Sequence, residues 1–242
     1  MTDIKEIFNG QVDLVSVTSK ALNTQKSVKI YTPYGYSKRS KYSVLYMFHG
    51  GGGDHHSWIP HLGLNQRLDQ LIQERAINPL IIVAPQMGQG YAGGGNEEFL
   101  SSELIQYVDS NYSTEPSREC RYVGGLSMGG FIALHQAFTH PELFSKVGGH
   151  SPYLYTEAGV NDAVENPIIT AKKMDLTGLK VYLDAGIYDP FNLVATNAEL
   201  YRTLFIKGIA SENHPNPGGH DAAYWMANID KYLMFYTGRN PK

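Results

Sequence analysis

The sequence has little of several features that would point to particular classes of protein. Its 242 residues include one cysteine, Cys120, so the chain can form no internal disulfide and no metal site that needs several thiolates. No eighteen apolar residues run together, so we expect no transmembrane helix. The formal net charge is only -3, so no basic field is present to hold nucleic acid or an anionic membrane. We expect neither partner.

The first ten residues, MTDIKEIFNG, lack a basic segment followed by an apolar core and a small-residue cleavage site. We therefore expect a cytoplasmic protein, although a mature chain or an excised domain of a secreted enzyme would look the same. Repeats and low-complexity tracts are also missing, and the length suits one α/β domain over residues 1–242. The sequence does not determine the oligomeric state and is compatible with a homo-oligomer.

What the sequence does contain is an alternation of short apolar runs with helical patterns. Runs bounded by turn residues predict buried strands at 44–48, 80–84, 121–123, 146–147 and 181–183. Apolar residues at helical spacing predict helices over 98–111 and 225–236. Such alternation implies right-handed crossovers and a mostly parallel sheet with helices on both faces. The runs at 12–17 and 28–31 have no helix between them, so we expect an antiparallel strand pair at the N-terminal end.

One motif in this pattern carries chemistry. Gly125-Leu126-Ser127-Met128-Gly129 has the form G-x-S-x-G, which alone is a weak signal. Here it follows the predicted strand at 121–123 and opens a predicted helix, which is the context of a nucleophile elbow. Such a turn exposes the serine hydroxyl at the carboxyl edge of the sheet, beside a helix N-terminus that favours negative charge. We predict that Ser127 is a nucleophile rather than an ordinary turn residue.

A nucleophilic serine needs a general base and an orienting acid, which on this fold follow in the order acid, then histidine. Asp189 comes just after the predicted strand at 180–185, at its carboxyl end, and is our candidate acid. Asp184, inside that strand, is the alternative. The only histidines after Asp189 are His214 and His220. His220 enters the last helix through a Gly-Gly loop and is our candidate base, whereas His214, beside a proline, looks like a surface turn residue.

The tetrahedral intermediate of acyl transfer also needs two N–H donors for its oxyanion. The backbone amide of Met128 comes with the elbow. The second donor is expected in the loop His49-Gly50-Gly51-Gly52-Gly53-Asp54, which follows the strand at 44–48 as the HGGG-type loop does in esterases. We predict Gly51 as this donor, with Gly50 as the alternative, and expect His49 to hold the loop rather than to react.

With these residues in place, the sequence resembles the "putative esterase" family of α/β-hydrolases. That family includes feruloyl and acetyl-xylan esterases, S-formylglutathione hydrolase and bacterial mycolyltransferases, and the likeness is greatest to the feruloyl-esterase-like branch. The matching stretches run in order from Val44–Asp54 with Trp58, through Glu103–Ile105 and Asp109–Tyr112, to Gly125–Gly130 and Gly218–Asp221. The resemblance implies the α/β-hydrolase fold, a Ser127, Asp189 and His220 triad, oxyanion amides at Met128 and near Gly51, and no cofactor.

Aromatic residues fall in loops expected at the catalytic edge, where they would suit a sugar or a phenolic acyl group. They are Trp58, Tyr91, Tyr153, Tyr155, Tyr188 and Phe191. We take Trp58, Tyr153 and Phe191 as candidate substrate-binding residues, although with 17 tyrosines some must lie on any surface. Residues 151–177, where this family builds its substrate wall, contain no motif that matches a known substrate specificity.

The histidines outside the candidate triad point to no metal. Asp54, His55, His56 and His61 lack the fixed spacing of a zinc motif, so we interpret them as surface residues. His150 follows the predicted strand at 146–147 and either lines the pocket or lies in the core.

These observations predict a serine carboxylesterase that hydrolyses small acyl esters, among them acetyl or feruloyl esters of carbohydrates, through an acyl-enzyme. Thioester hydrolysis and acyl transfer to another alcohol use the same residues and stay open as alternatives. An alternative of a different class is a non-catalytic module that binds carbohydrate or a partner on a hydrolase scaffold.

Overall fold

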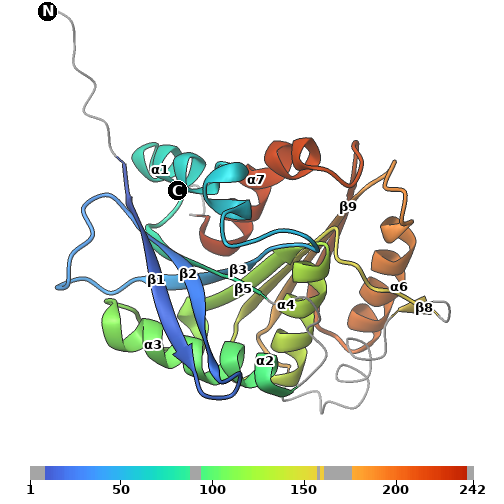
Figure 1. Cartoon of the computed structure of the whole chain (residues 1–242). Helices are drawn as coiled ribbons and strands as arrows, with labels where there is room; N and C mark the ends of the chain where they lie inside the picture. Colours follow the sequence, from blue (N-terminus) through green and yellow to red (C-terminus); the bar gives the residue numbers. More distant parts are fainter. Residues whose placement is uncertain (1–8, 88–93, 157–158, 161–175, 239–242) are drawn as a thin grey trace, which may run out of the picture.

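A computed structural model describes residues 9–87, 94–156, 159–160 and 176–238 (Figure 1). Its centre is an eight-stranded sheet in the order β1-β2-β4-β3-β5-β6-β9-β10. The strands of this sheet are β1 (Gln11–Ser19), β2 (Thr24–Thr32), β3 (Ser43–Phe48), β4 (Leu80–Pro85), β5 (Arg121–Leu126), β6 (Lys146–His150), β9 (Lys180–Gly186) and β10 (Ala210–Asn216). The short strands β7 (Tyr155–Thr156) and β8 (Gly159–Val160) pair apart from it.

Helical segments connect the strands and cover both faces of the sheet (Figure 1). The α-helices are α1 (Leu64–Gln73), α2 (Gly94–Glu98), α3 (Leu104–Asn111), α4 (Met128–Thr139), α6 (Leu193–Ile206) and α7 (Ala222–Thr237). Short segments of other helical geometry are η1 (Ser57–His61), η2 (Phe99–Glu103) and η3 (Arg118–Cys120). None of the helices within the described ranges combines the length and the apolar character that a bilayer crossing requires.

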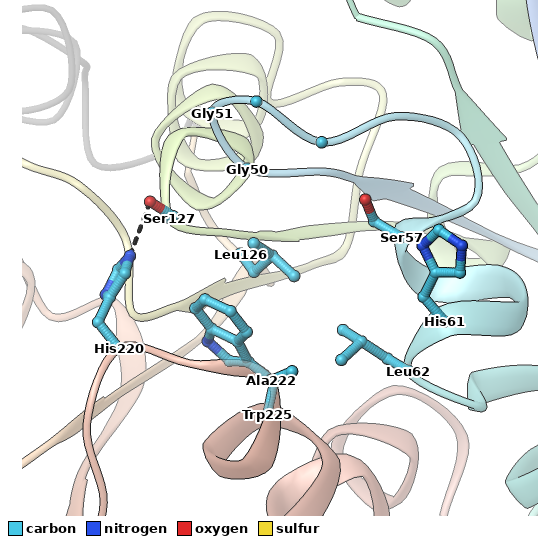
Figure 2. A pocket seen from close by; sticks show the side chains of 12 residues that line it. Gly50, Gly51, Ser57, His61, Leu62, Leu126, Ser127, His220, Ala222 and Trp225 are labelled. Atoms are coloured by element: carbon cyan, nitrogen blue, oxygen red, sulfur yellow. Dashed lines mark hydrogen bonds between the residues drawn. The ribbon is translucent and has the colours of Figure 1, made fainter.

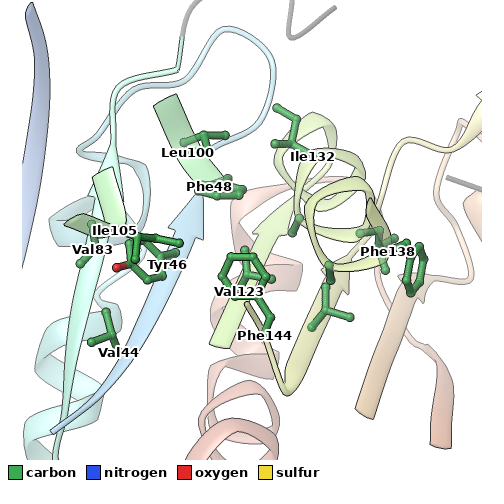
Figure 3. Close-up of a cluster of buried hydrophobic side chains, with 14 of the residues drawn as sticks. Val44, Tyr46, Phe48, Val83, Leu100, Ile105, Val123, Ile132, Phe138 and Phe144 are labelled. Carbon is green, nitrogen blue, oxygen red and sulfur yellow. The ribbon is translucent and has the colours of Figure 1, made fainter. Parts of the chain in front are cut away.

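The two faces of the sheet bury two separate apolar clusters, because alternate side chains of a strand point to opposite faces. Val44, Tyr46 and Phe48 of β3 belong to a cluster on one face that also contains residues of α3, α4 and α6 (Figure 3). Leu45 and Met47 of the same strand pack with α1 and α7 on the other face. The part of a strand that is covered on both sides is apolar at nearly every position, and this is why most of β3 and β4 could be found in the sequence as continuous apolar runs.

The strand order places the candidate site. β3 pairs in parallel with both β4 and β5, so the chain moves to one side of β3 after it and later returns to the other side. Ligands of open α/β sheets bind beyond the carboxyl ends of the strands at such a switch point. The loop after β3 and the turn after β5, which contains Ser127, therefore meet at this edge.

The predicted fold class is confirmed: a mostly parallel sheet begins with an antiparallel pair, β1 and β2, and carries helices on both faces. The predicted helix over 98–111 is divided among the end of α2, η2 and α3. The short strands β7 and β8 were not predicted. One strand of the central sheet was also missed, because β10 lies at the sheet edge, has no fully buried residue and has no apolar run. His214 lies in β10, so its prediction as a turn residue is wrong, and its ring stacks on Tyr182.

Candidate active site

Ser127 lies in a tight turn between β5 and α4, with φ 54° and ψ −120°. A positive φ is uncommon for serine and marks a constrained position. The flanking glycines are required by close packing. A Cβ at Gly125 would lie 2.3 Å from the Gly129 carbonyl oxygen, and one at Gly129 would lie 2.3 Å from that of Phe48. The G-x-S-x-G spacing is therefore what lets the turn close against β3.

Three residues far apart in the sequence meet at this turn. Ser127 Oγ lies 2.9 Å from His220 Nε2, and His220 Nδ1 lies 2.7 Å from Asp189 Oδ2. The side chain of Asp189 is fully buried and that of His220 is 11% exposed. An ionised carboxylate can only accept hydrogen bonds, so Nδ1–H of His220 donates to Asp189 and leaves Nε2 free to accept the serine proton. This is the arrangement of a nucleophile, a base and an orienting acid.

Asp184, the alternative acid, faces a different histidine. Its side chain is fully buried in β9, and its Oδ1 lies 3.0 Å from His150 Nδ1. His150 is also fully buried, so it lies in the core and does not line the pocket. Asp189 is held in its own position because its Oδ1 accepts the Phe191 N–H at 2.9 Å. The geometry thus favours Asp189 over Asp184 as the partner of His220.

The glycine loop after β3 packs directly on the elbow. A Cβ at Gly50 would lie 2.6 Å from Leu126 Cδ1 and 3.2 Å from Ser127 Cβ. His49 fixes this loop, because its Nε2 accepts the Met87 N–H at 2.9 Å and its Nδ1 lies 2.8 Å from the Gly50 carbonyl oxygen. Burial lowers the pKa of His49, so the imidazole is neutral and Nδ1–H donates to Gly50. His49 therefore supports the loop, as the sequence predicted.

Gly51 lines a pocket of about 450 Å³ that opens beside Ser127. Met128 is the first residue of α4, where helix N–H groups have no partner inside the helix. Both backbone amides predicted as oxyanion donors therefore belong to segments beside the Ser127 hydroxyl. A Cβ built at Gly51 has nothing within 4 Å, so a side chain at this position would leave the backbone N–H in place.

The pocket combines an apolar middle with polar ends. Its lining consists of Gly50, Gly51, Gly52, Gly53, Ser57, His61, Leu62, Leu126, Ser127, His220, Ala222 and Trp225. Figure 2 shows Ser57 and His61 at the end away from Ser127 and His220, with Leu126 and Trp225 between them. The volume lies within the usual range for small-molecule sites.

Trp225 is the functional candidate that the sequence analysis missed. It was assigned only to an apolar helix face, yet it lines the pocket, and its ring meets that of His220 edge to face at 5.1 Å. Its place on the first turn of the helix that follows His220 was the available signal. Leu126 was also missed: it directly precedes the candidate nucleophile in the sequence, and it lines the pocket.

The predicted substrate-binding aromatics divide into two groups. Tyr153 and Phe191 are 42% and 46% exposed, and their rings meet edge to face at 5.5 Å. They line a shallow groove with Pro190 and Asn192, and Phe191 also contacts the His220 ring. This groove therefore lies on the side of His220 that carries Asp189.

The prediction for Trp58 is wrong. Its side chain is 1% exposed and does not line the pocket. The indole N–H donates to the Phe48 carbonyl oxygen at 2.9 Å, and the ring packs edge to face against His150 and Tyr232. The segment η1 turns this tryptophan into the core rather than toward the catalytic edge. Of the other aromatics, Tyr188 is 74% exposed, whereas Tyr91 and the side chain of Tyr155 lie outside the described residues.

The histidines near η1 take part in ordinary polar contacts. His55 Nδ1 lies 3.0 Å from Gln86 Oε1, and His56 Nδ1 lies 2.8 Å from Lys29 Nζ. The Lys29 ammonium can only donate, so His56 Nδ1 accepts a hydrogen bond from it. In the part of the chain that the structure describes, no three His, Cys, Asp or Glu side chains are grouped so as to hold a metal ion.

Comparison with known proteins gives one family. The model of the family described as "Putative esterase" matches residues 19–236. A curated relative, "Endo-1,4-beta-xylanase/feruloyl esterase" of Xylanibacter ruminicola, is 31% identical over 172 residues, which cover 65% of this chain and 24% of the relative. "Endo-1,4-beta-xylanase Y" of Acetivibrio thermocellus is 35% identical over 130 residues, 48% of this chain and 12% of the relative. The chain thus spans a quarter or less of the length of these two relatives.

Among solved structures, one described as a ferulic acid esterase superposes with a TM-score of 0.85 at 25% identity. The match covers 95% of this chain and 98% of that structure. The two chains therefore share one fold over nearly their whole length. Together with the family match, this likeness supports a carboxylic-ester hydrolase with an α/β-hydrolase fold.

Proposed function

The chain belongs to the "Putative esterase" family, and from this premise we propose that it is a serine carboxylic-ester hydrolase that works through an acyl-enzyme. The observation that carries the proposal is the continuous chain of contacts from Ser127 Oγ to His220, 2.9 Å, and from His220 to Asp189, 2.7 Å. These distances lie within the range for a base that accepts a proton from its nucleophile.

In the first step Ser127 Oγ attacks the ester carbonyl carbon while His220 Nε2 takes the hydroxyl proton. The resulting imidazolium is stabilised by the buried Asp189 carboxylate, which keeps its charge. When the tetrahedral intermediate collapses, the bond to the alcohol breaks and His220 returns the proton to that alcohol. In the second half His220 takes a proton from water as its oxygen attacks the acyl carbon. When this second tetrahedral intermediate collapses, the bond to Ser127 Oγ breaks, His220 returns the proton to Oγ, and the acid leaves.

The oxyanion of both tetrahedral intermediates is proposed to lie against the backbone amides of Met128 and Gly51. Fixed donors of this kind stabilise charge that develops only in the transition state, so they accelerate the chemical step. The support is the position of Gly51 in the pocket lining and of Met128 at the first turn of α4, both next to Ser127. His49 would contribute indirectly, by holding Gly50.

For the substrate we propose an acetyl or feruloyl ester of a carbohydrate. Two openings support this choice, because an ester held at Ser127 has an acyl side and an alcohol side. One is the pocket with Leu126 and Trp225, and the other is the groove with Tyr153 and Phe191. Exposed aromatic rings such as these suit a sugar ring or a phenolic acid. The names of the relatives, xylanase and feruloyl esterase, point the same way.

The test is hydrolysis of nitrophenyl acetate, nitrophenyl butyrate, methyl ferulate and acetylated xylan by the wild type and by Ser127→Ala. We expect the wild type to hydrolyse at least one ester and Ser127→Ala to lose at least about 10⁴ in kcat, with an unchanged circular dichroism spectrum. A fluorophosphonate probe should label the wild type at Ser127 and leave the variant unlabelled.

The alternatives give different results in the same experiment. A thioester hydrolase or acyltransferase would be labelled by the probe but would prefer a thioester, or an added alcohol as acceptor. A non-catalytic module would leave Ser127 unlabelled in the folded protein and would hydrolyse none of the esters. Residual activity of Ser127→Ala close to the wild type would remove Ser127 from the mechanism.

A further inference from the structure

A buried polar cluster lies between the sheet and α7, outside the pocket. Its centre is the fully buried Asp184 carboxylate in β9. Oδ2 accepts hydrogen bonds from the Tyr224 hydroxyl at 2.6 Å and the Tyr232 hydroxyl at 2.9 Å, and Oδ1 lies 3.0 Å from His150 Nδ1. A buried carboxylate is costly unless such donors surround it, so this cluster holds the elements that supply them in fixed positions.

Tyr224 links this cluster to the loop that carries His220. It lies on the first turn of α7, where its N–H donates to the capping carboxylate of Asp221 at 2.9 Å. Its ring packs on Gly218: a Cβ at that glycine would lie 2.6 Å from Tyr224 Cδ2. Gly218 has φ 132°, a conformation that favours glycine. The Tyr224 ring therefore supports the loop two residues before His220.

The same loop also contacts the segment that holds Asp189. The Gly218 carbonyl oxygen accepts the Tyr188 N–H at 3.0 Å, and the Asn216 carbonyl oxygen accepts the Ile187 N–H at 2.9 Å. A displacement of Gly218 would therefore move His220 relative to both Asp189 and Ser127. Misplacement of a reacting group by about 1 Å can cost on the order of 10²-fold in rate.

We propose that Tyr224, held by the Asp184 carboxylate, is a positioning residue for His220. The hydroxyl bond to Asp184 fixes the ring, the ring fixes Gly218, and Gly218 keeps His220 Nε2 within reach of Ser127 Oγ. Hydrogen bonds to a charged acceptor are stronger than neutral ones, which suits a bond that must hold a loop. The inference rests on the proposed function, since it concerns the base of that mechanism.

Tyr232 provides a matched control. It donates to the same oxygen of Asp184 and is also buried, but it lies two turns further along α7, away from the His220 loop. Tyr224→Phe and Tyr232→Phe each remove one hydroxyl and keep the ring. A merely structural role predicts that both variants lose stability and neither loses turnover. A positioning role predicts that turnover falls in Tyr224→Phe alone.

The experiment measures four quantities for the wild type and both variants: the melting temperature, kcat and KM on the best nitrophenyl ester, and the rate of fluorophosphonate labelling of Ser127. We expect Tyr224→Phe to lose about 10- to 100-fold in kcat and in labelling rate, with KM within about twofold. Tyr232→Phe should keep kcat within about threefold. Equal values of kcat in the two variants, or an unchanged kcat in Tyr224→Phe, would overturn the inference.

Asp184→Asn provides a second variant if Tyr224→Phe does not fold. It keeps the size of the side chain and removes the charge that strengthens the Tyr224 bond, so kcat should fall again with KM little changed, and an unchanged kcat overturns the inference. The two proposals fail in different ways. An unlabelled wild type overturns the proposed function and this inference with it, whereas a labelled wild type with an unimpaired Tyr224→Phe overturns this inference alone.

Discussion

Replacement of Asp189 by asparagine tests how much the charge of the orienting acid contributes to catalysis. The carboxylate is fully buried and lies 2.7 Å from His220 Nδ1, so the imidazolium formed during catalysis has its counter-charge in direct contact. With charge centres roughly 4 Å apart and an effective dielectric constant of about 20, the attraction is about 4 kcal/mol. Because about 1.4 kcal/mol is a factor of ten, this predicts a loss of about three orders of magnitude in kcat.

The tautomer of His220 adds to this loss. The introduced amide can donate to Nδ1, which would move the imidazole proton to Nε2 and leave that nitrogen unable to accept from Ser127. The same exchange in a serine-protease triad costs about 10⁴ in kcat. We therefore expect Asp189→Asn to lower kcat by about 10³ to 10⁴ and to change KM much less.

The assay is steady-state hydrolysis of nitrophenyl acetate, with circular dichroism as a check on folding. Asp221→Asn is the matched control, because this residue adjoins His220 but only caps α7, and asparagine caps equally well. It should keep kcat within about threefold. A loss below tenfold in Asp189→Asn, together with a loss above about 10³ in Asp184→Asn, would make Asp184 the acid and refute the reasoning.

Three further predictions concern the loop and the groove. Gly50→Ala places a methyl 3.2 Å from Ser127 Cβ and should lower both kcat, at least about tenfold, and the melting temperature, whereas the methyl of Gly51→Ala meets nothing within 4 Å and should leave the melting temperature unchanged; an equal fall of the melting temperature in both variants would contradict this. The pKa of His49 is lowered by burial, so the unfolded chain binds a proton below about pH 6.5 before the folded protein does, and the melting temperature should fall with pH there. His49→Gln, which removes the titratable ring and keeps an acceptor and a donor in the side chain, should flatten that fall, and an equally steep fall of the melting temperature with pH in the variant would be evidence against His49 as its cause. Tyr153→Ala should raise KM for feruloylated oligosaccharides about two- to tenfold and leave that for nitrophenyl acetate unchanged; an equal rise for both esters would remove Tyr153 from sugar binding.

Much of the molecule follows from local signals in the sequence. β3 is apolar from Val44 to Phe48 and β4 from Leu80 to Pro85 because these stretches are covered on both faces, so each is a continuous run that a short window detects. Gly125 and Gly129 flank Ser127 because the turn tolerates no Cβ at either position. The order of nucleophile, acid and histidine along the chain is likewise written in the sequence, so Ser127, Asp189 and His220 could be named as partners before any contact between them was known.

Other features depend on contacts between segments that are distant in the sequence, and only the tertiary structure decided them. Residue type does not distinguish Trp58, which η1 turns into the core, from Trp225, which α7 directs into the pocket, and only the closeness of Trp225 to His220 in the sequence pointed to the site. β10 could not be found because an edge strand buries too little apolar surface to leave a run. Asp184 and Asp189 are five residues apart, yet one faces His150 and the other faces His220. Side-chain types and their spacing specify which chemistry is available, whereas burial and direction, which depend on packing across the sheet, select the residues that meet.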